Sequence, residues 1–213
     1  MNFFIQYLQT NPFFYFTTIV IVMFSICVHE CAHAWVALKQ GDDTSAWLGH
    51  ISLNPRVQMG WQSMVILLLF GIAWGAVPYN PRNFRNPWSG ALMAFAGPLA
   101  NLILSFLFAA GVAVSLHFQP ADALDATPVL QFFARASSLN AMLFIFNMVP
   151  LPILDGWKVL SLFIPDMARI PPQHANSISW IGMILLWSRG SALLWGGSHL
   201  ISSAFVGLWR FVF

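Results

Sequence analysis

Charged residues are scarce in this chain of 213 residues. Only 8% of them are Asp, Glu, Lys or Arg, whereas 58% are hydrophobic, and the mean hydropathy is +0.71. A soluble globular domain carries about a quarter charged residues, so the composition predicts an integral membrane protein. The 9 basic and 7 acidic residues are also too few and too scattered to indicate nucleic-acid binding.

The sequence also has few cysteines and no sign of a cleavable signal peptide. The chain has two cysteines, Cys27 and Cys31, which form no CxxC motif, and we interpret them as small packing residues. The first ten residues lack Lys and Arg, and the apolar run that follows contains ionisable groups, so we expect it to be retained rather than cleaved. With no detectable repeat or appended soluble module, we expect one membrane domain over residues 1–213.

Three apolar stretches are long enough to cross a bilayer, which takes about 20 helical residues. We predict helices over about residues 12–38, 88–117 and 128–148, the first beginning after a cap at Asn11. Residues 176–188 and 191–213 form either two short helices or one that is interrupted at residues 188–190. The predicted fold is an all-α polytopic membrane protein with a core over about residues 12–165 and C-terminal helices over about 175–213.

The segment between the first two spans has no long apolar run. Residues 44–59 alternate in a β-like way that Gly49 and Asn54-Pro55 break, which favours a strand, a hairpin or a loop. Residues 62–77 are apolar but short and interrupted by Gly71 and Gly75, so we predict that they re-enter the membrane. Re-entry would place Lys39, Arg56, Arg82, Arg85, Lys158 and Arg169 on one side, which the positive-inside rule makes cytoplasmic. The link with Asp122 and Asp125 would lie on the other side.

Ionisable residues stand inside the first predicted span, in the sequence VHECAHAW of residues 28–35. His29 and His33 are one helical turn apart, so both imidazoles can face one ion, and Glu30 flanks them. Two histidines and a third ligand leave a place on Zn²⁺ for water, whose proton the carboxylate can take. The alternative is a polar cluster that packs helices, but an ionisable group in a membrane costs at least about 2.5 kcal/mol and rarely persists without a role.

Two other segments offer polar groups near the expected site. Asp155 follows Pro150 and Pro152, which interrupt the third helix, and we predict that it is the third ligand; the alternative is that it caps a new helical turn. In the second span, the sequence AGPLAN provides small residues for close packing and Asn101, which either packs helices or binds a substrate backbone.

Together these motifs resemble the site-2 protease family of intramembrane zinc metalloproteases. The resemblance is carried by HECAH, by GPLAN, and by Asn147 followed by Pro150, Pro152 and Asp155-Gly156, with LNP and NPRNFRNP in between. One departure is Trp157, where many relatives have a second glycine. No insertion is long enough for a PDZ domain, so the chain resembles a compact member.

The resemblance implies a three-helix catalytic core and one Zn²⁺ held by His29, His33 and Asp155. It implies that Glu30 is the general base and that Asn147 holds the substrate or the transition state. It further implies cleavage within the transmembrane helix of single-span membrane proteins, such as anti-sigma factors or other signalling proteins, near the cytoplasmic side of a bacterial or archaeal membrane. An extended substrate could pair with residues 44–59 by edge addition.

Two other functions remain as alternatives. A metal-ion transporter would string polar groups along the membrane normal, whereas these residues cluster at one depth. A catalytically silent relative that binds membrane helices would not need His29, Glu30, His33 and Asp155 intact. The sequence leaves the substrate and the oligomeric state open.

Overall fold

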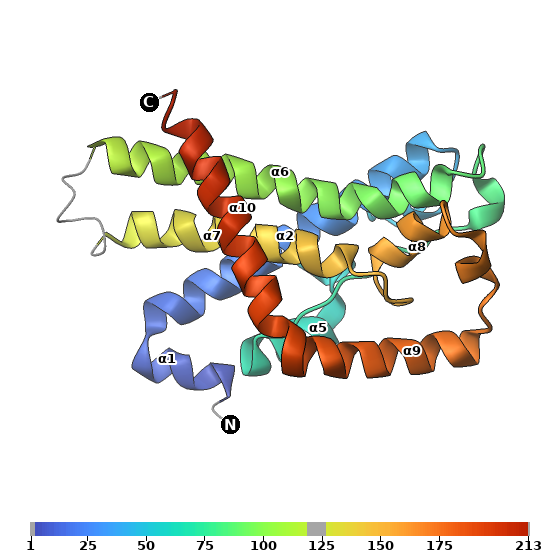
Figure 1. Cartoon of the computed structure of the whole chain (residues 1–213), viewed down its shortest axis with the longest axis horizontal. Helices are drawn as coiled ribbons and strands as arrows, with labels where there is room; N and C mark the ends of the chain where they lie inside the picture. The colour runs from blue at the N-terminus through green and yellow to red at the C-terminus, as the bar shows by residue number, and fades with distance from the viewer. Residues whose placement is uncertain (1–2, 119–126, 213) are drawn as a thin grey trace. The chain divides into compact units, whose positions relative to one another are not determined.

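A computed structural model describes residues 3–118 and 127–212, and these residues fall into two compact units, 1–89 and 90–213. The predicted aspartates of the link, Asp122 and Asp125, lie outside the described residues. The described residues form helices and connecting segments without a strand, which confirms the all-α class. Figure 1 gives the order of the elements along the chain.

The first unit is built on the long helix α2, Pro12–Lys39. Its start is fixed locally, because the Asn11 side chain accepts a hydrogen bond from the Phe14 amide and Pro12 occupies the first turn. The 28 residues of α2 span about 42 Å at 1.5 Å per residue, which is ample for a bilayer. Both the predicted helix and its cap are therefore confirmed.

Short helices pack on one side of α2. They are α1, Tyr7–Thr10, after a 3₁₀ turn at Phe4–Gln6, and α5, Gly60–Phe70. The Tyr15 hydroxyl on α2 donates to the Leu68 carbonyl of α5 at 3.0 Å. A buried apolar cluster joins α2 to α5 and includes Tyr15, Ile19, Ile26, Cys27, Met59 and Leu67. The packing role predicted for Cys27 is confirmed.

The strand or hairpin predicted for residues 44–59 is wrong. This segment forms two single-turn helices, α3 at Thr44–Trp47 and α4 at Pro55–Gln58. Local side-chain hydrogen bonds explain the difference: the Asp42 carboxylate accepts from the Thr44 amide at the start of α3, and Asn54, the N-cap residue of α4, accepts from the Arg56 amide. Local hydrogen bonds of this kind compete with strand pairing, so the apolar alternation did not produce a β structure.

Helix α5 and the extended residues after it replace the apolar run predicted at 62–77. Eleven helical residues rise only about 16 Å, roughly half of the hydrocarbon thickness. The helix ends at Gly71, whose φ of +73° is the left-handed conformation typical of such ends. Residues 72–80 then run without regular structure to a 3₁₀ turn at Pro81–Asn83, and we call residues 72–80 the strap. A short helix that does not continue agrees with re-entry, which stays a prediction.

The second unit contains two long helices, α6 at Ser89–Phe118 and α7 at Pro128–Met148, which lie side by side (Figure 1). Both were predicted to within one residue. Buried polar side chains connect them: Asn101 donates to Asn140 at 3.1 Å, and the Ser137 hydroxyl donates to the Ser105 carbonyl at 2.9 Å. Such interhelical hydrogen bonds are typical of helix packing in membranes.

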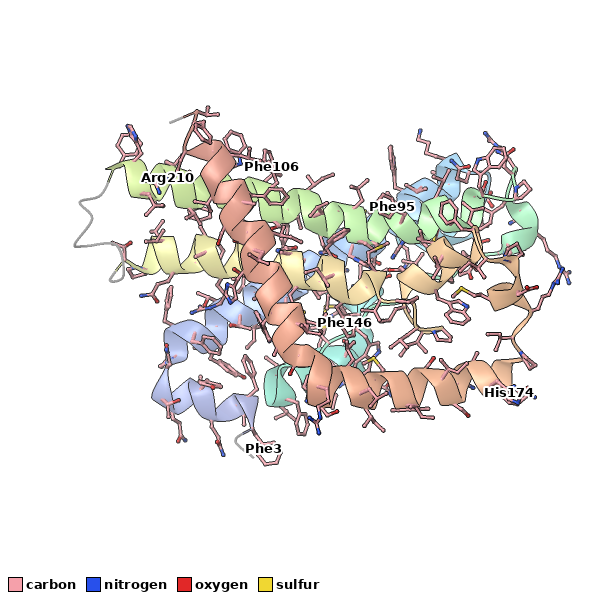
Figure 2. All side chains as sticks on the ribbon, viewed as in Figure 1. Phe3, Phe95, Phe106, Phe146, His174 and Arg210 are labelled. Carbon is pink, nitrogen blue, oxygen red and sulfur yellow. The ribbon has the colours of Figure 1, made fainter. Side chains whose placement is uncertain are left out.

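The chain ends in α8, Asp155–Ser161, a 3₁₀ turn at Pro165–Arg169, α9, Pro172–Leu185, and α10, Ser191–Trp209. A π-helical turn at Leu186–Gly190 joins α9 to α10, close to the predicted interruption. Helix α10 crosses α7 (Figure 1) and is fixed by the Trp209 indole, which donates to the Phe106 carbonyl at 2.9 Å. Phe106 lies on α6 where α10 passes (Figure 2).

By length and composition, four helical segments of the described residues could cross a membrane: Pro12–Lys39, Ser89–Phe118, Pro128–Met148 and Gln173–Trp209. The chain is therefore a multi-pass membrane protein.

Candidate metal centre

The centre of the first unit's chemistry is a histidine pair on α2. His29 and His33 are 7% and 5% exposed, and their Nε2 atoms are 2.9 Å apart. The imidazole planes are nearly perpendicular, at 86°, and the short distance between the Nε2 atoms brings one nitrogen of each ring to the same place. Zinc bonds histidine nitrogen at about 2.0–2.1 Å, and two nitrogens at this spacing can both reach one ion. The pair fits a zinc ion.

Glu30 lies between His29 and His33 on α2 and is 7% exposed. Its side chain lies against the backbone of the strap at Gly75: a Cβ on that glycine would stand 2.6 Å from Glu30 Cδ. The carboxylate is thus held between its own helix and the strap. The sequence predicted Glu30 at this site, but it gave no indication of the contact with Gly75.

Asp155 belongs to the second unit, where it is the first residue of α8 and half-buried. The two prolines predicted to interrupt α7 do so, since α7 ends at Met148 and α8 begins at Asp155. Leu154 is the N-cap residue of α8 and makes no side-chain cap hydrogen bond, and Asp155 stands in the first turn. The role of Asp155 as a ligand stays a prediction.

Gly156 explains how α8 can start so close to α7. A Cβ at this position would stand 2.5 Å from the carbonyl carbon of Met148 and 2.8 Å from the oxygen of Val149. Both are backbone atoms, which cannot rotate away. Only glycine therefore permits this return of the chain, and the return sets the position of Asp155 next to it.

The two predicted asparagines occupy different environments. Asn101 is fully buried and donates to Asn140 within the second unit. Asn147 is half-buried in the last turn of α7, where its amide donates to the Leu143 carbonyl at 2.9 Å. Neither observation tests a role in substrate binding, so both roles stay predictions.

A hydrogen-bonded knot around Asp42, just after α2, was missed by the sequence reasoning. Asp42 is fully buried and accepts from the Asn80 amide at 2.7 Å, the Asn83 side chain at 3.0 Å, and both the amide and the hydroxyl of Thr44. Burial raises the pKa of Asp42, but these hydrogen bonds outweigh burial and leave the pKa below its usual value. The knot attaches the end of the strap to the end of α2.

Comparison of the sequence with known protein families identifies the family of this chain. The sequence profile described as Peptidase family M50 matches residues 17–127 and 113–188, which together hold every predicted site residue. The chain belongs to peptidase family M50. This is the site-2 protease family, so the resemblance found in the three motifs is confirmed. As a member of this family, the chain is a metalloprotease of the membrane, and zinc is its cofactor.

Several proteins are similar to this M50 peptidase. It is 36% identical over 202 residues to "Putative zinc metalloprotease YwhC" of Bacillus subtilis, covering 92% of this chain and 90% of that protein. It is 32% identical over 170 residues to "Putative zinc metalloprotease Rip2" of Mycobacterium tuberculosis, covering 76% and 63%. It is 34% identical over 135 residues to "Putative zinc metalloprotease MJ0611" of Methanocaldococcus jannaschii, covering 62% of each. No solved structure matches the chain significantly.

Proposed function

We propose that this M50 peptidase is an intramembrane endopeptidase that hydrolyses a peptide bond within the transmembrane helix of single-span membrane proteins. One observation carries the proposal: His29, Glu30 and His33 are buried inside a helix long enough to span the bilayer, about two to three turns from its end at Lys39. A protease whose catalytic groups lie at this depth acts on peptide bonds that are themselves in the membrane.

We propose that His29, His33 and Asp155 hold the zinc ion. The two imidazoles already converge, and a carboxylate is a chemically suitable third ligand that leaves one position open. The break between α7 and α8 supports Asp155, because non-helical backbone at membrane depth is tolerated where it is buried or lines a wet cavity. Bound zinc supplies a Lewis acid that polarises the scissile carbonyl and makes a water easier to deprotonate.

Glu30 then serves as the general base. Its carboxylate takes a proton from the attacking water and delivers that proton to the leaving amide nitrogen. Contact with the strap at Gly75 restricts the position of the carboxylate, and Glu30 directly follows His29 on α2. The protein thus provides a proton carrier beside the metal ligands.

A substrate helix must unwind locally before it reaches these groups, because its carbonyls are engaged in helical hydrogen bonds. We therefore propose that substrates contain helix-weakening residues near the cut. The side chain of Asn147, at the end of α7, is our candidate for binding the unwound backbone. Asn101 is the weaker candidate, since it is fully buried whereas Asn147 is only half-buried.

We propose a bacterial or archaeal cytoplasmic membrane, with the site toward the cytoplasm. The relatives named above come from bacteria and an archaeon, and the positive-inside rule places the basic residues after α2 in the cytoplasm. The partners that we expect in this membrane are anti-sigma factors and other signalling proteins with a single transmembrane span.

The test compares wild type with Glu30→Gln and Asp155→Ala in detergent, measuring zinc content and cleavage of a panel of single-span substrates. We expect Glu30→Gln to keep zinc and lose cleavage by about 100-fold or more, because general-base catalysis contributes that much. Asp155→Ala should lose both. A Glu30→Gln variant that cleaves as wild type does, while wild type binds zinc, would contradict the protease mechanism and favour a metal transporter or a helix-binding protein.

A further inference from the structure

We infer that Gly75 is a positioning residue for Glu30: the strap sets the place of the carboxylate, and only a residue without a Cβ can occupy the point of contact. This inference rests on the role proposed above for Glu30. It concerns only residues of the first unit, α2 and the segments from α4 to the strap.

The contact leaves no room for a side chain. An added Cβ on Gly75 would collide with Cγ, Cδ and Oε1 of Glu30, at 2.6 Å from Cδ. The φ of Gly75 does not lie in the left-handed region that favours glycine. The requirement for glycine here is therefore spatial, and it is imposed by the functional side chain itself.

The strap cannot easily retreat from Glu30, because the residues on both sides of Gly75 are tied down. The buried Ser63 hydroxyl of α5 donates to the Trp74 carbonyl at 2.6 Å and accepts from the Trp74 amide at 2.8 Å. The Ala76 amide donates to the Gln58 carbonyl of α4 at 3.1 Å. Fixing residues 74 and 76 fixes the backbone at residue 75.

The residues that hold the strap are themselves held in place by further contacts. Gln58 is 1% exposed, and its side chain donates to the carbonyls of His50 and Ser52. Further along the strap, Asn80 is held in the Asp42 knot, and Ala73 packs against the apolar cluster between α2 and α5. A clash at residue 75 would therefore displace Glu30 rather than the strap.

The first test is a double-mutant cycle on the thermal unfolding of the metal-free protein, which needs no activity. Gly75→Ala should lower the midpoint by about 3 °C or more in the wild-type background. In the Glu30→Ala background, the colliding atoms are gone, so the same substitution should cost less than about 1 °C. An equal loss in both backgrounds would overturn the inference, because the clash would then not involve Glu30.

Folding failure also gives a clear answer. If Gly75→Ala does not fold but Gly75→Ala/Glu30→Ala does, the contact is supported. If neither folds while Glu30→Ala alone does, the contact is overturned. Gly196→Ala in α10 is the matched control, since its added Cβ would meet nothing within 4 Å, and it should not lower the midpoint.

The second test asks whether the contact positions the carboxylate. Gly75→Ala should lower kcat by about 10- to 100-fold, the loss expected from a displacement near 1 Å, with KM and zinc content near wild type. The exposed neighbour Ala76 provides a control on the same strap, and Ala76→Ser should keep kcat. A Gly75→Ala enzyme with unchanged kcat, or a loss confined to KM, would overturn the positioning role. If wild type cleaves no substrate, the proposed function fails, but the unfolding cycle still tests the contact.

Discussion

Both units bury polar side chains, but the two sets of side chains differ in the partners that can satisfy them. In the second unit, Asn101 and Asn140, and Ser137 with Ser105 and Ser202, are neutral groups that bond one another between helices. In the first unit, α2 buries two imidazoles with converging nitrogens and a carboxylate. Neutral donors and acceptors satisfy each other and stabilise packing, whereas a converging imidazole pair suits a cation. A buried polar side chain in a membrane helix therefore indicates a catalytic or metal-binding role only when that side chain binds a cation or a proton.

The largest effect that this comparison predicts is on metal binding. His33→Ala should reduce zinc affinity by more than about 100-fold, because changes to groups that merely support a ligand already cost 10- to 100-fold. The measurement is zinc content after dialysis against a graded chelator. His199→Ala on α10 is the control and should retain zinc. Equal zinc retention in the two variants would contradict the assignment of the histidine pair.

Next in size is the Asp42 knot. Asp42→Ala removes a buried charged acceptor and leaves the donors of Thr44, Asn80 and Asn83 without it, which should cost about 3 kcal/mol of unfolding free energy. Thermal or denaturant unfolding in detergent measures the loss. Asp43→Ala is a neighbouring control, because the exposed Asp43 carboxylate accepts from the exposed Trp47 indole, and it should cost far less.

The same knot predicts a dependence on pH. The pKa of Asp42 is lowered in the folded protein from 3.8, so its stabilising contribution is present above pH 3.8 and is lost as the pH falls below this value. Unfolding midpoints measured from pH 6 to pH 3 should therefore fall more steeply for wild type than for Asp42→Asn at the acidic end. Parallel curves would show that Asp42 is not the group responsible.

A smaller loss is expected where backbone approaches backbone. Gly156→Ala would press a Cβ against Met148 and Val149, and overpacking of this kind costs about 1–3 kcal/mol. Because the contact sets the start of α8, zinc affinity should fall as well. Gly207→Ala, whose Cβ would meet nothing within 4 Å, is the comparison and should leave both the unfolding free energy and zinc binding intact.

The smallest loss of stability is expected for the interhelical hydrogen bonds of the second unit. Ser137→Ala removes the bond to the Ser105 carbonyl and the contact with Ser202. Interhelical hydrogen bonds in membranes average about 0.6 kcal/mol, so stability should drop by about that amount while zinc content stays the same. A loss of zinc in Ser137→Ala would remove the distinction between the two units.

Much of this fold could be predicted because its signals are local. The cap at Asn11, the limits of α7 and the turn-spaced pair of His29 and His33 each depend on neighbours within a few residues. Residues 44–59 were mispredicted because the side chains of Asp42 and Asn54 accept hydrogen bonds from nearby backbone amides and favour single helical turns there, which outweighs the alternation of apolar residues. Gly75 could not be assigned from the sequence, since its role depends on a side chain 45 positions away in the chain and its backbone conformation carries no signal.

The most direct test of the account is to map the cut made by this peptidase in a single-span substrate, with both proteins reconstituted in vesicles and the products identified by mass spectrometry. We predict that the hydrolysed bond lies within the transmembrane segment of the substrate and that Glu30→Gln yields no such product. Cleavage confined to the parts of the substrate outside the membrane, or the same internal cut by Glu30→Gln, would contradict the account.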